Sequence, residues 1–247
     1  MQDNHGERQV LSQDLLIRVT GFFRDPETFQ ALVESVFPSL LADRSPEAPL
    51  RIWVPGCASG EEVYSIAICL LEFLGERAIS TPIQIFGTDV SETAIEKARA
   101  GNYLDNGKIS SERLRRFFVK LDDHYQITKS LRDLCIFAPQ NLTRDPPFSR
   151  LDLVSCRNVL IYMDQTLPKQ VLLLFHHALN PQGFLVLGPS ETIGQSSDLF
   201  ELVDRQHRIY RRLAVPRHLG LELAAGERHV PRAGGARGRS GRRRCPW

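Results

Sequence analysis

Residues 51–67 read RIWVPGCASGEEVYSIA: an apolar segment, a glycine-containing loop and then a helix-forming segment. In α/β proteins, such a strand–loop–helix unit usually carries a nucleotide. Gly56 and Gly60 let the backbone turn sharply and let a ligand approach closely. The loop has no lysine and lacks the GxGxxG spacing, so it is not a phosphate-binding loop. Because Glu61 and Glu62 follow it, the loop favours a ligand that is neutral or cationic at this point.

The helix that follows the loop gives Glu62 a second interpretation. Ser59 and Glu62 match the S-x-x-E capping box, in which two side chains satisfy free amides at a helix start. Acidic residues in the first turn also interact favourably with the helix dipole. Both interpretations stay open here: Glu62 caps the helix, binds a ligand, or does both.

A second buried strand, predicted over 83–90, contains Asp89 at its end. An acid at the tip of the strand after a glycine loop suits a bidentate contact to ribose hydroxyls. The alternative is a helix cap, but Ser91 already suits that role for the helix predicted over 91–100. Ribose binding without phosphate binding indicates an adenosyl ligand with a positive centre, and S-adenosylmethionine has that character.

Strands alternate with helices along the chain, which predicts a mostly parallel sheet with helices on both faces. Asp25 is expected to cap a first helix, with Pro26 in its first turn. The segment 119–128 alternates around Asp122 and Asp123 and reads as a small antiparallel hairpin. The other expected strands are 50–54, 134–142, 183–188, 207–213 and one that starts at 151; the other expected helices are 60–73, 110–118 and 167–179.

Two further groups of polar residues sit at predicted strand ends. Asn141 and Leu142 follow one strand, and Arg157 and Asn158 follow the next, with Tyr162 shortly beyond. Ligands in open α/β sheets bind outside the carboxyl ends of the strands. We therefore expect these residues to converge on the same crevice as the glycine loop, although asparagine is also a common turn former.

The overall net charge of +2 hides an asymmetry. Residues 211–247 hold ten arginines and two glutamates, a net charge of +8, so the rest of the chain carries −6. We expect an arginine-rich, disordered tail over 214–247 and a frayed N-terminus over 1–13. The body shows no basic stripe interleaved with aromatic residues, so no specific nucleic-acid partner is expected.

The chain contains neither a signal-like N-terminus nor an apolar run that could cross a bilayer, which indicates a cytoplasmic protein without membrane insertion. The five cysteines form no CxxC pair, and no HExxH occurs. Those at 57, 69, 135 and 156 lie in or beside apolar segments and are interpreted as reduced, structural residues, so no metal site is expected.

Four segments carry a resemblance to a known family: TGFFRD, WVPGCASGEEVYSIA, FGTDVSETAIEKARAGNY and SCRNVLIYMD. In this order they resemble the chemotaxis-receptor methyltransferases (CheR type), which are S-adenosylmethionine-dependent protein-glutamate O-methyltransferases. These segments are also similar to the methyltransferase module of large proteins in which it is fused to a methylesterase and PAS domains. The resemblance implies an α/β, Rossmann-like S-adenosylmethionine methyltransferase fold over 14–213, with a small β-subdomain at about 105–135.

The resemblance also implies roles for the matching residues. It places Thr20 and Arg24 at the methionine part of the cofactor, with Arg24 near the reacting methyl group. It places Glu62 at the cofactor's amino group and Asp89 at the ribose. It implies that Asn141 and Leu142 flank the adenine, that Arg157 and Asn158 close the pocket, and that Tyr162 faces the substrate. Arg24 and Tyr162 are thus the candidate catalytic residues. The family often has asparagine where this chain has Arg18.

The implied activity is methylation of glutamate carboxylates on chemoreceptor cytoplasmic domains or related signalling proteins by a monomer. S-adenosylhomocysteine would be the second product. Two alternatives stay open: a methyltransferase of the same fold with another acceptor, because fold alone does not choose one, and a non-catalytic signalling module that binds the cofactor. A nucleotide-dependent oxidoreductase is disfavoured by Glu61 and Glu62.

Overall fold

The computed structural model describes residues 20–214, except residues 43, 46, 105, 106, 165 and 195. The frayed N-terminus expected over 1–13 and the arginine-rich tail from residue 215 onward lie outside the described residues. Within the described part of the chain, no helix is long and apolar enough to cross a bilayer.

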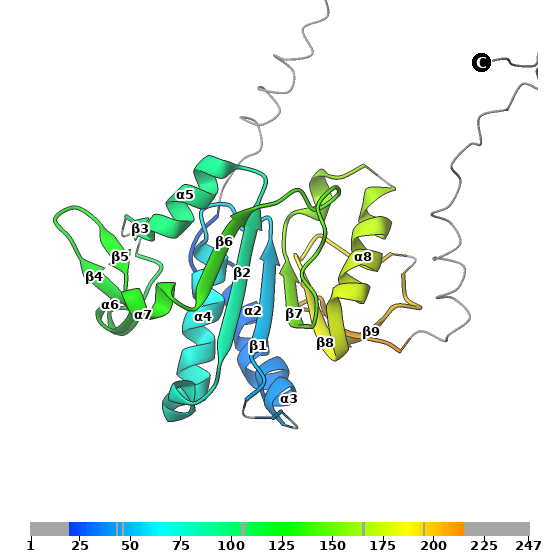
Figure 1. The fold of residues 1–247 in the computed structure, drawn as a ribbon, viewed down its shortest axis with the longest axis horizontal. Coiled ribbons are helices and arrows are strands. Elements are labelled where there is room, and N and C mark those ends of the chain that lie inside the picture. Colours follow the sequence, from blue (N-terminus) through cyan, green and yellow to red (C-terminus); the bar gives the residue numbers. More distant parts are fainter. Residues whose placement is uncertain are drawn as a thin grey trace, which may run out of the picture. The chain divides into compact units, whose positions relative to one another are not determined.

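A seven-stranded sheet forms the centre of the fold, in the order β6-β2-β1-β7-β8-β10-β9 (Figure 1). Its five strands from β6 to β8 run parallel, whereas β10 is antiparallel to both β8 and β9. The strands are β1 (Leu50–Pro55), β2 (Ile83–Asp89), β6 (Cys135–Pro139), β7 (Leu151–Cys156), β8 (Leu179–Leu187), β9 (Phe200–Asp204) and β10 (Ile209–Arg212).

The order of the strands reverses between β1 and β7. Strands that follow β1 along the chain build outward on one side, through β2 to β6, and β7 begins the other side. A crevice for a ligand forms at such a switch point, outside the carboxyl ends of the strands. The five parallel strands confirm the predicted mostly parallel sheet.

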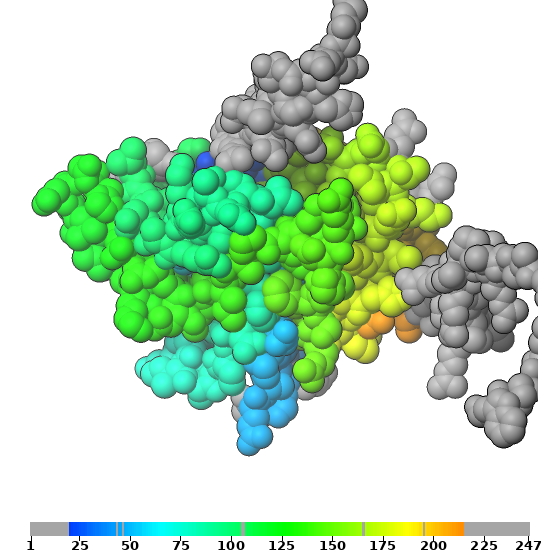
Figure 2. All heavy atoms as spheres, turned by 45° about the horizontal axis from the view of Figure 1, so that its top comes forward, coloured from blue at the N-terminus to red at the C-terminus, as the bar shows by residue number. Residues whose placement is uncertain are grey.

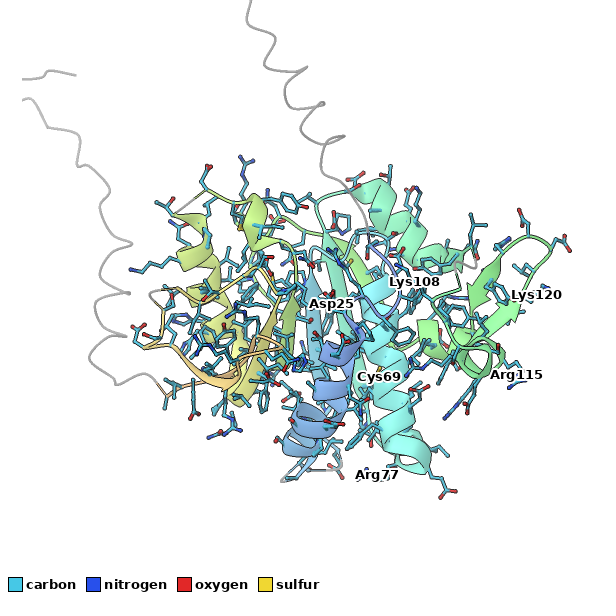
Figure 3. All side chains as sticks on the ribbon, turned by 180° about the vertical axis from the view of Figure 1, so that it is seen from behind. Asp25, Cys69, Arg77, Lys108, Arg115 and Lys120 are labelled. Atoms are coloured by element: carbon cyan, nitrogen blue, oxygen red, sulfur yellow. The ribbon has the colours of Figure 1, made fainter. Side chains whose placement is uncertain are left out.

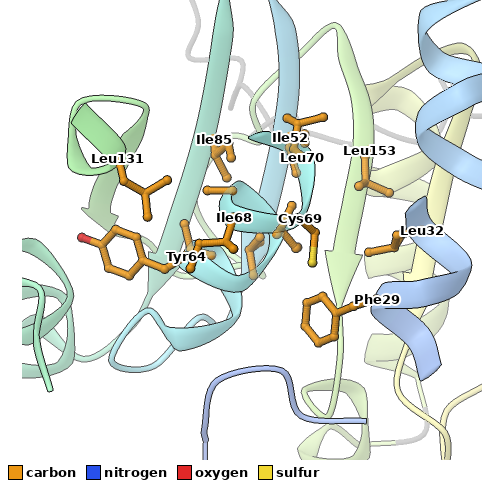
Figure 4. Close-up of a cluster of buried hydrophobic side chains, with 14 of the residues drawn as sticks. Phe29, Leu32, Ile52, Tyr64, Ile68, Cys69, Leu70, Ile85, Leu131 and Leu153 are labelled. Carbon is orange, nitrogen blue, oxygen red and sulfur yellow. The ribbon is translucent and has the colours of Figure 1, made fainter. Parts of the chain in front are cut away.

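Apolar side chains of β1 alternate between the two faces of the sheet. Ile52 belongs to the core cluster with residues of α4 (Glu61–Leu74) and of the first helical segment, including Ile68 and Leu32 (Figure 4). Trp53 points the other way, with its ring 5.6 Å from that of Phe175 on α8 (Leu167–Ala178). Helices thus cover both faces, as predicted, because both faces of a parallel strand are apolar.

The first helical segment is less regular than the periodicity predicted. It consists of α2 (Pro26–Ala31), a π-helical turn η1 (Leu32–Val36) and α3 (Phe37–Leu41). Pro26 does occupy the first helical turn, and Asp25 does precede it, but the Asp25 side chain makes no cap bond. The remaining helices of the main layer are α5 (Glu92–Ala100) and two 3₁₀ turns, η2 (Gly75–Ile79) and η3 (Leu160–Tyr162).

A small antiparallel sheet forms a separate layer at one edge, seen from behind in Figure 3 around Lys120 and Arg115. The predicted hairpin is present as β4 (Phe118–Lys120) and β5 (Tyr125–Ile127). A third strand, β3 (Asn102–Tyr103), pairs with β5 and was not predicted. The helices α6 (Ser111–Phe117) and α7 (Lys129–Arg132) flank this sheet.

Candidate functional site

A cavity of about 700 Å³ lies at the carboxyl ends of β1, β2, β6 and β7. Figure 2 turns this end of the sheet toward the viewer, with α5 and the loop after β6 on its surface. All nine residues that were assigned to the cofactor or the substrate line this one cavity, whereas Glu61 does not. They are Thr20, Arg24, Glu62, Asp89, Asn141, Leu142, Arg157, Asn158 and Tyr162.

The glycine loop is tied to the end of β2 by the carboxylate of Asp89. Its Oδ2 accepts the amide of Ala58 at 2.9 Å, and its Oδ1 accepts the amide of Ser91 at 2.9 Å. Ser91 caps α5 as predicted, because its hydroxyl accepts the amide of Ala94. Each Asp89 oxygen has two acceptor sites, so each retains one for a ligand hydroxyl.

The predicted capping box between Ser59 and Glu62 is wrong. Gly60 occupies the N-cap position of α4, and no side chain caps it. The Ser59 hydroxyl instead donates to the Glu61 carboxylate at 2.8 Å. Glu62 turns toward the end of β7, where its Oε1 accepts the hydroxyl of Ser155 at 2.7 Å. Of its two proposed roles, the helix cap is therefore excluded.

Burial destabilises the ionised form of the Glu62 carboxylate. Its side chain is 16% exposed, and desolvation raises its pKa above the ordinary value. The guanidinium of Arg157 and the Ser155 hydroxyl counteract this rise in part, whereas Glu191 adds to it. An additional positive group in the cavity would stabilise the ionised form.

Arg157 bridges Glu62 and the N-terminal segment. Its Nη1 lies 3.5 Å from Glu62 Oε2, and its Nη2 lies 2.6 Å from Asp25 Oδ2. The same Nη2 donates to the backbone carbonyl of Arg24 at 2.9 Å. The side chain of Arg157 is only 2% exposed and packs over the ring of Phe29. Arg157 thus holds the segment that carries Arg24 against the sheet.

The turn after β7 is held by a residue that the sequence analysis missed. Buried Glu191, on the loop after β8, accepts backbone amides from residues 158, 159, 160 and 188. Glu191 does not itself line the cavity. Its only sequence signal is an acid shortly after a predicted strand end, which many surface loops share.

Asn141 acts as the turn former that its residue type suggested. Its side-chain oxygen accepts both the amide and the hydroxyl of Thr143, and Asp145 accepts the Asn141 amide at 2.7 Å. This turn presents Leu142 to the cavity. Tyr162 lies on η3 at the rim and is 58% exposed, so its phenol is accessible to a large substrate.

Two non-glycine residues that line the cavity have positive φ: Ala58 (46°) and Asn158 (60°). Phe23 (50°) and Asp25 (58°) flank the lining residue Arg24, whereas Arg150, Gln182 and Arg208 have positive φ away from the cavity. Such conformations cost on the order of 1–3 kcal/mol each and persist only where the surroundings enforce them. They cluster at ligand sites more often than elsewhere, which supports this cavity as the functional site.

Three cysteines in the described residues, Cys57, Cys69 and Cys156, are buried free thiols, and Cys135 is partly buried. Burial raises the pKa of Cys69 to about 11. Cys57 lines the cavity, and burial with nearby Asp89 raises its pKa too, so it is a poor nucleophile at neutral pH.

Comparison with known proteins identifies one family model, described as the S-adenosylmethionine-binding domain of the CheR methyltransferases, which matches residues 18–209. A relative from Rhodobacter capsulatus, "Uncharacterized 104.1 kDa protein in hypE 3'region", is 40% identical over 84% of the chain. The chain spans only 22% of that relative.

Shorter relatives are similar over most of their length. "Putative methyltransferase Cher3" from Pseudomonas putida is 38% identical, over 82% of this chain and 76% of its own. "Chemotaxis protein methyltransferase 1" from Pseudomonas aeruginosa is 33% identical, over 80% and 74%. Among solved structures, the "DhpI-SAH complex structure" matches with a TM-score of 0.42 and 13% identity, over 81% and 73% of the two chains.

Proposed function

The chain belongs to the CheR methyltransferase family, whose cofactor is S-adenosylmethionine, and on that premise we propose that it methylates glutamate side chains of chemoreceptor-type signalling proteins. The acceptors would be cytoplasmic domains of such proteins, and the enzyme would act as a cytoplasmic monomer. The observation that carries the proposal is the convergence of all nine motif residues on one cavity.

The side chains that line the cavity fit the cofactor. Glu62 is a partly buried carboxylate whose pKa is raised mainly by desolvation, and an ammonium group beside it would favour the ionised form. Asp89 retains one acceptor site on each oxygen, which suits the two hydroxyls of a ribose. No lysine lines the cavity among the described residues, but two arginines, Arg24 and Arg157, do.

When bound, S-adenosylmethionine would supply a methyl group on a sulfonium. A carboxylate oxygen of the acceptor would bond to the methyl carbon as the carbon–sulfur bond breaks, so that the electron pair stays on sulfur and S-adenosylhomocysteine leaves. A glutamate with a reference pKa of ~4.3 is already ionised near pH 7, so no side chain has to take up a proton. The enzyme therefore contributes alignment and partial desolvation of the carboxylate.

Within this mechanism, Arg24 and Tyr162 position the reactants. Arg24 lies on the segment that Arg157 anchors, and we propose that it orients the acceptor or methionine carboxylate. Tyr162 lies at the rim and would orient the acceptor by a hydrogen bond. Thr20, Asn141, Leu142 and Asn158 would complete the cofactor contacts.

The test is transfer of a labelled methyl group from S-adenosylmethionine to receptor cytoplasmic domains. We expect label on the receptor that base releases as methanol, because methyl esters hydrolyse and N-methyl groups do not. Replacing the acceptor glutamates by alanine should abolish the label. Base-stable label would instead indicate another acceptor. Tight cofactor binding without transfer to any receptor would favour a non-catalytic signalling module.

A further inference from the structure

Glu191 is a carboxylate almost entirely removed from water, with 3% of its surface exposed. Its Oε2 accepts the amides of Gly188 at 2.6 Å and Asn158 at 2.9 Å. Its Oε1 accepts the amides of Val159 at 2.8 Å and Leu160 at 2.7 Å. Four charge-assisted hydrogen bonds to backbone amides are the acceptor capacity of one carboxylate, so the group is saturated.

Three of those amides belong to consecutive residues of the turn that follows β7. Two of these residues, Asn158 and Val159, line the cofactor cavity. Asn158 also holds a positive φ of 60°, which an asparagine adopts only at a cost. The convergence of three successive amides on one anion makes a backbone nest, here turned inward toward a protein carboxylate.

The fourth amide is that of Gly188, so the same carboxylate also binds the backbone just after β8. A β-carbon at Gly188 would lie 2.8 Å from both the Asn158 amide nitrogen and Glu191 Oε2. Gly188 therefore permits the close approach of the turn, and Glu191 then fixes it.

The position of the turn also reaches the glycine loop after β1. A β-carbon at Gly56 would lie 2.5 Å from Cγ2 of Val159, so Val159 packs directly on the loop backbone. A shift of the turn would thus move two walls of the cavity together: the one after β7 and the one after β1.

We propose that Glu191 is a positioning residue of the cofactor site, whose saturated carboxylate fixes the turn over residues 158–160 and, through Val159, the glycine loop. This role rests on the proposed cofactor site, although Glu191 touches neither cofactor nor acceptor. A positioning role explains why the carboxylate of Glu191 is kept inside the protein although its charge disfavours the ionised form of Glu62.

The arrangement requires a carboxylate, and this gives the proposal a sharp test. Glu191→Gln has nearly the same shape, but its NH₂ group would face two amide donors and leave them without an acceptor. Glu191→Asp keeps the charge but is one methylene shorter, so it cannot reach the ends of both strands. Glu201→Gln, at an exposed glutamate on β9, is the matched control.

Calorimetric titration with S-adenosylhomocysteine separates positioning from general destabilisation. If Glu191 positions the turn, Glu191→Gln weakens binding about 10-fold or more with unchanged stoichiometry, because every folded molecule has a displaced wall. Glu191→Asp should lie between wild type and Glu191→Gln, and Glu201→Gln should match wild type. A lower stoichiometry at unchanged affinity would show that Glu191 only stabilises the fold and would overturn the proposal.

Hydrogen exchange on the wild-type protein keeps the proposal testable even if the variants do not fold. The amides of residues 158, 159, 160 and 188 should exchange slowly, and bound S-adenosylhomocysteine should slow the first two further. Exchange as fast as in the exposed turn at residues 122–123 would overturn the proposal. Failure of wild type to bind S-adenosylhomocysteine would refute the proposed cofactor site. Slow exchange of the four amides would still show that Glu191 holds the turn.

Discussion

The Nη2 atom of Arg157 lies 2.6 Å from Oδ2 of Asp25, which joins the turn after β7 to a segment 132 residues earlier in the chain. The two ends of this ion pair have different environments. The Arg157 side chain is 2% exposed and that of Asp25 is 42% exposed. Because the buried member also approaches Glu62, this pair couples the N-terminal segment to the floor of the cavity.

Asp25→Asn should weaken this coupling without a change of shape. We expect S-adenosylhomocysteine to bind about 3- to 10-fold more weakly, because Arg157 loses a charged partner and the segment with Arg24 is held less firmly. The loss of stability should be small, about 1 kcal/mol or less, because Asp25 is partly exposed. Calorimetry and chemical denaturation measure the two effects. Glu27→Gln, at an exposed acid on α2, is the control, and equal affinities for both variants would show that the ion pair plays no part in binding.

Asp89→Ala should lower cofactor affinity by about 10-fold or more. The substitution removes the proposed ribose acceptor and also releases the amides of Ala58 and Ser91. Charged hydrogen bonds contribute about 1.5–3 kcal/mol each, which is consistent with a loss of this size. Calorimetry with S-adenosylhomocysteine measures it, with Asp122→Ala on the exposed hairpin turn as control. Unchanged affinity in Asp89→Ala would remove the ribose assignment.

Cofactor affinity should fall in mildly acidic solution because of Glu62. Burial raises the pKa of Glu62 in the free protein, and an ammonium partner favours the ionised form, so the pKa falls on binding. Affinity is therefore constant where Glu62 is ionised in both states, and it decreases as the pH drops through the raised pKa. An ordinary glutamate would delay this decrease to about pH 4.3.

Glu62→Gln is the control for this pH dependence. The variant should bind S-adenosylhomocysteine about 10-fold or more weakly near pH 7, because the ammonium loses a charged partner. Its affinity should also vary less between about pH 8 and pH 5, since glutamine does not titrate. The same pH profile in wild type and Glu62→Gln would assign the titration to another group.

Arg24→Ala should lower turnover more than binding. If Arg24 orients the reacting carboxylate, its loss misaligns the acceptor while most cofactor contacts remain, so kcat should fall about 10-fold or more and affinity by about 3-fold or less. Methyl-transfer kinetics and calorimetry together measure the split. Arg205→Ala, on the turn between β9 and β10, is the control. If neither quantity changed in Arg24→Ala, Arg24 would have only a structural role.

Much of this site could be predicted from the sequence because its residues follow strand ends. Asp89, Asn141 and Arg157 each stand at or shortly after the end of an apolar run, and parallel strands bring such positions to one edge. The two carboxylates after the glycine loop likewise predicted a ligand contact for Glu62, but the alternative of a helix cap was excluded only by the structure. These inferences needed only local patterns and the topology of a parallel sheet.

What the sequence could not predict depends on partners far away in the chain. The predicted capping box is wrong because the hydroxyl of Ser155, 93 residues later, donates a hydrogen bond to Glu62. The sequence does not reveal such a distant partner. Strand β9 was missed because Leu202 and Val203 are adjacent apolar residues, which breaks the alternation expected of a strand. Both side chains are substantially exposed in the structure. Strand β3 has two residues, too few for any periodicity.

Gly56→Ala should reduce both stability and cofactor affinity, because Gly56 has a φ of +66° and no room for a side chain. The left-handed backbone alone costs an alanine about 1–2 kcal/mol. The contact with Val159 adds to this cost by pushing the turn after β7 away from the loop. Gly194→Ala is the matched control, since Gly194 has a φ of +54° but no atom within 4 Å of a β-carbon. Denaturation should show a larger loss of stability for Gly56→Ala, and only this variant should bind S-adenosylhomocysteine more weakly. Equal losses of stability and equal affinities would mean that the Gly56–Val159 contact does not shape the cavity.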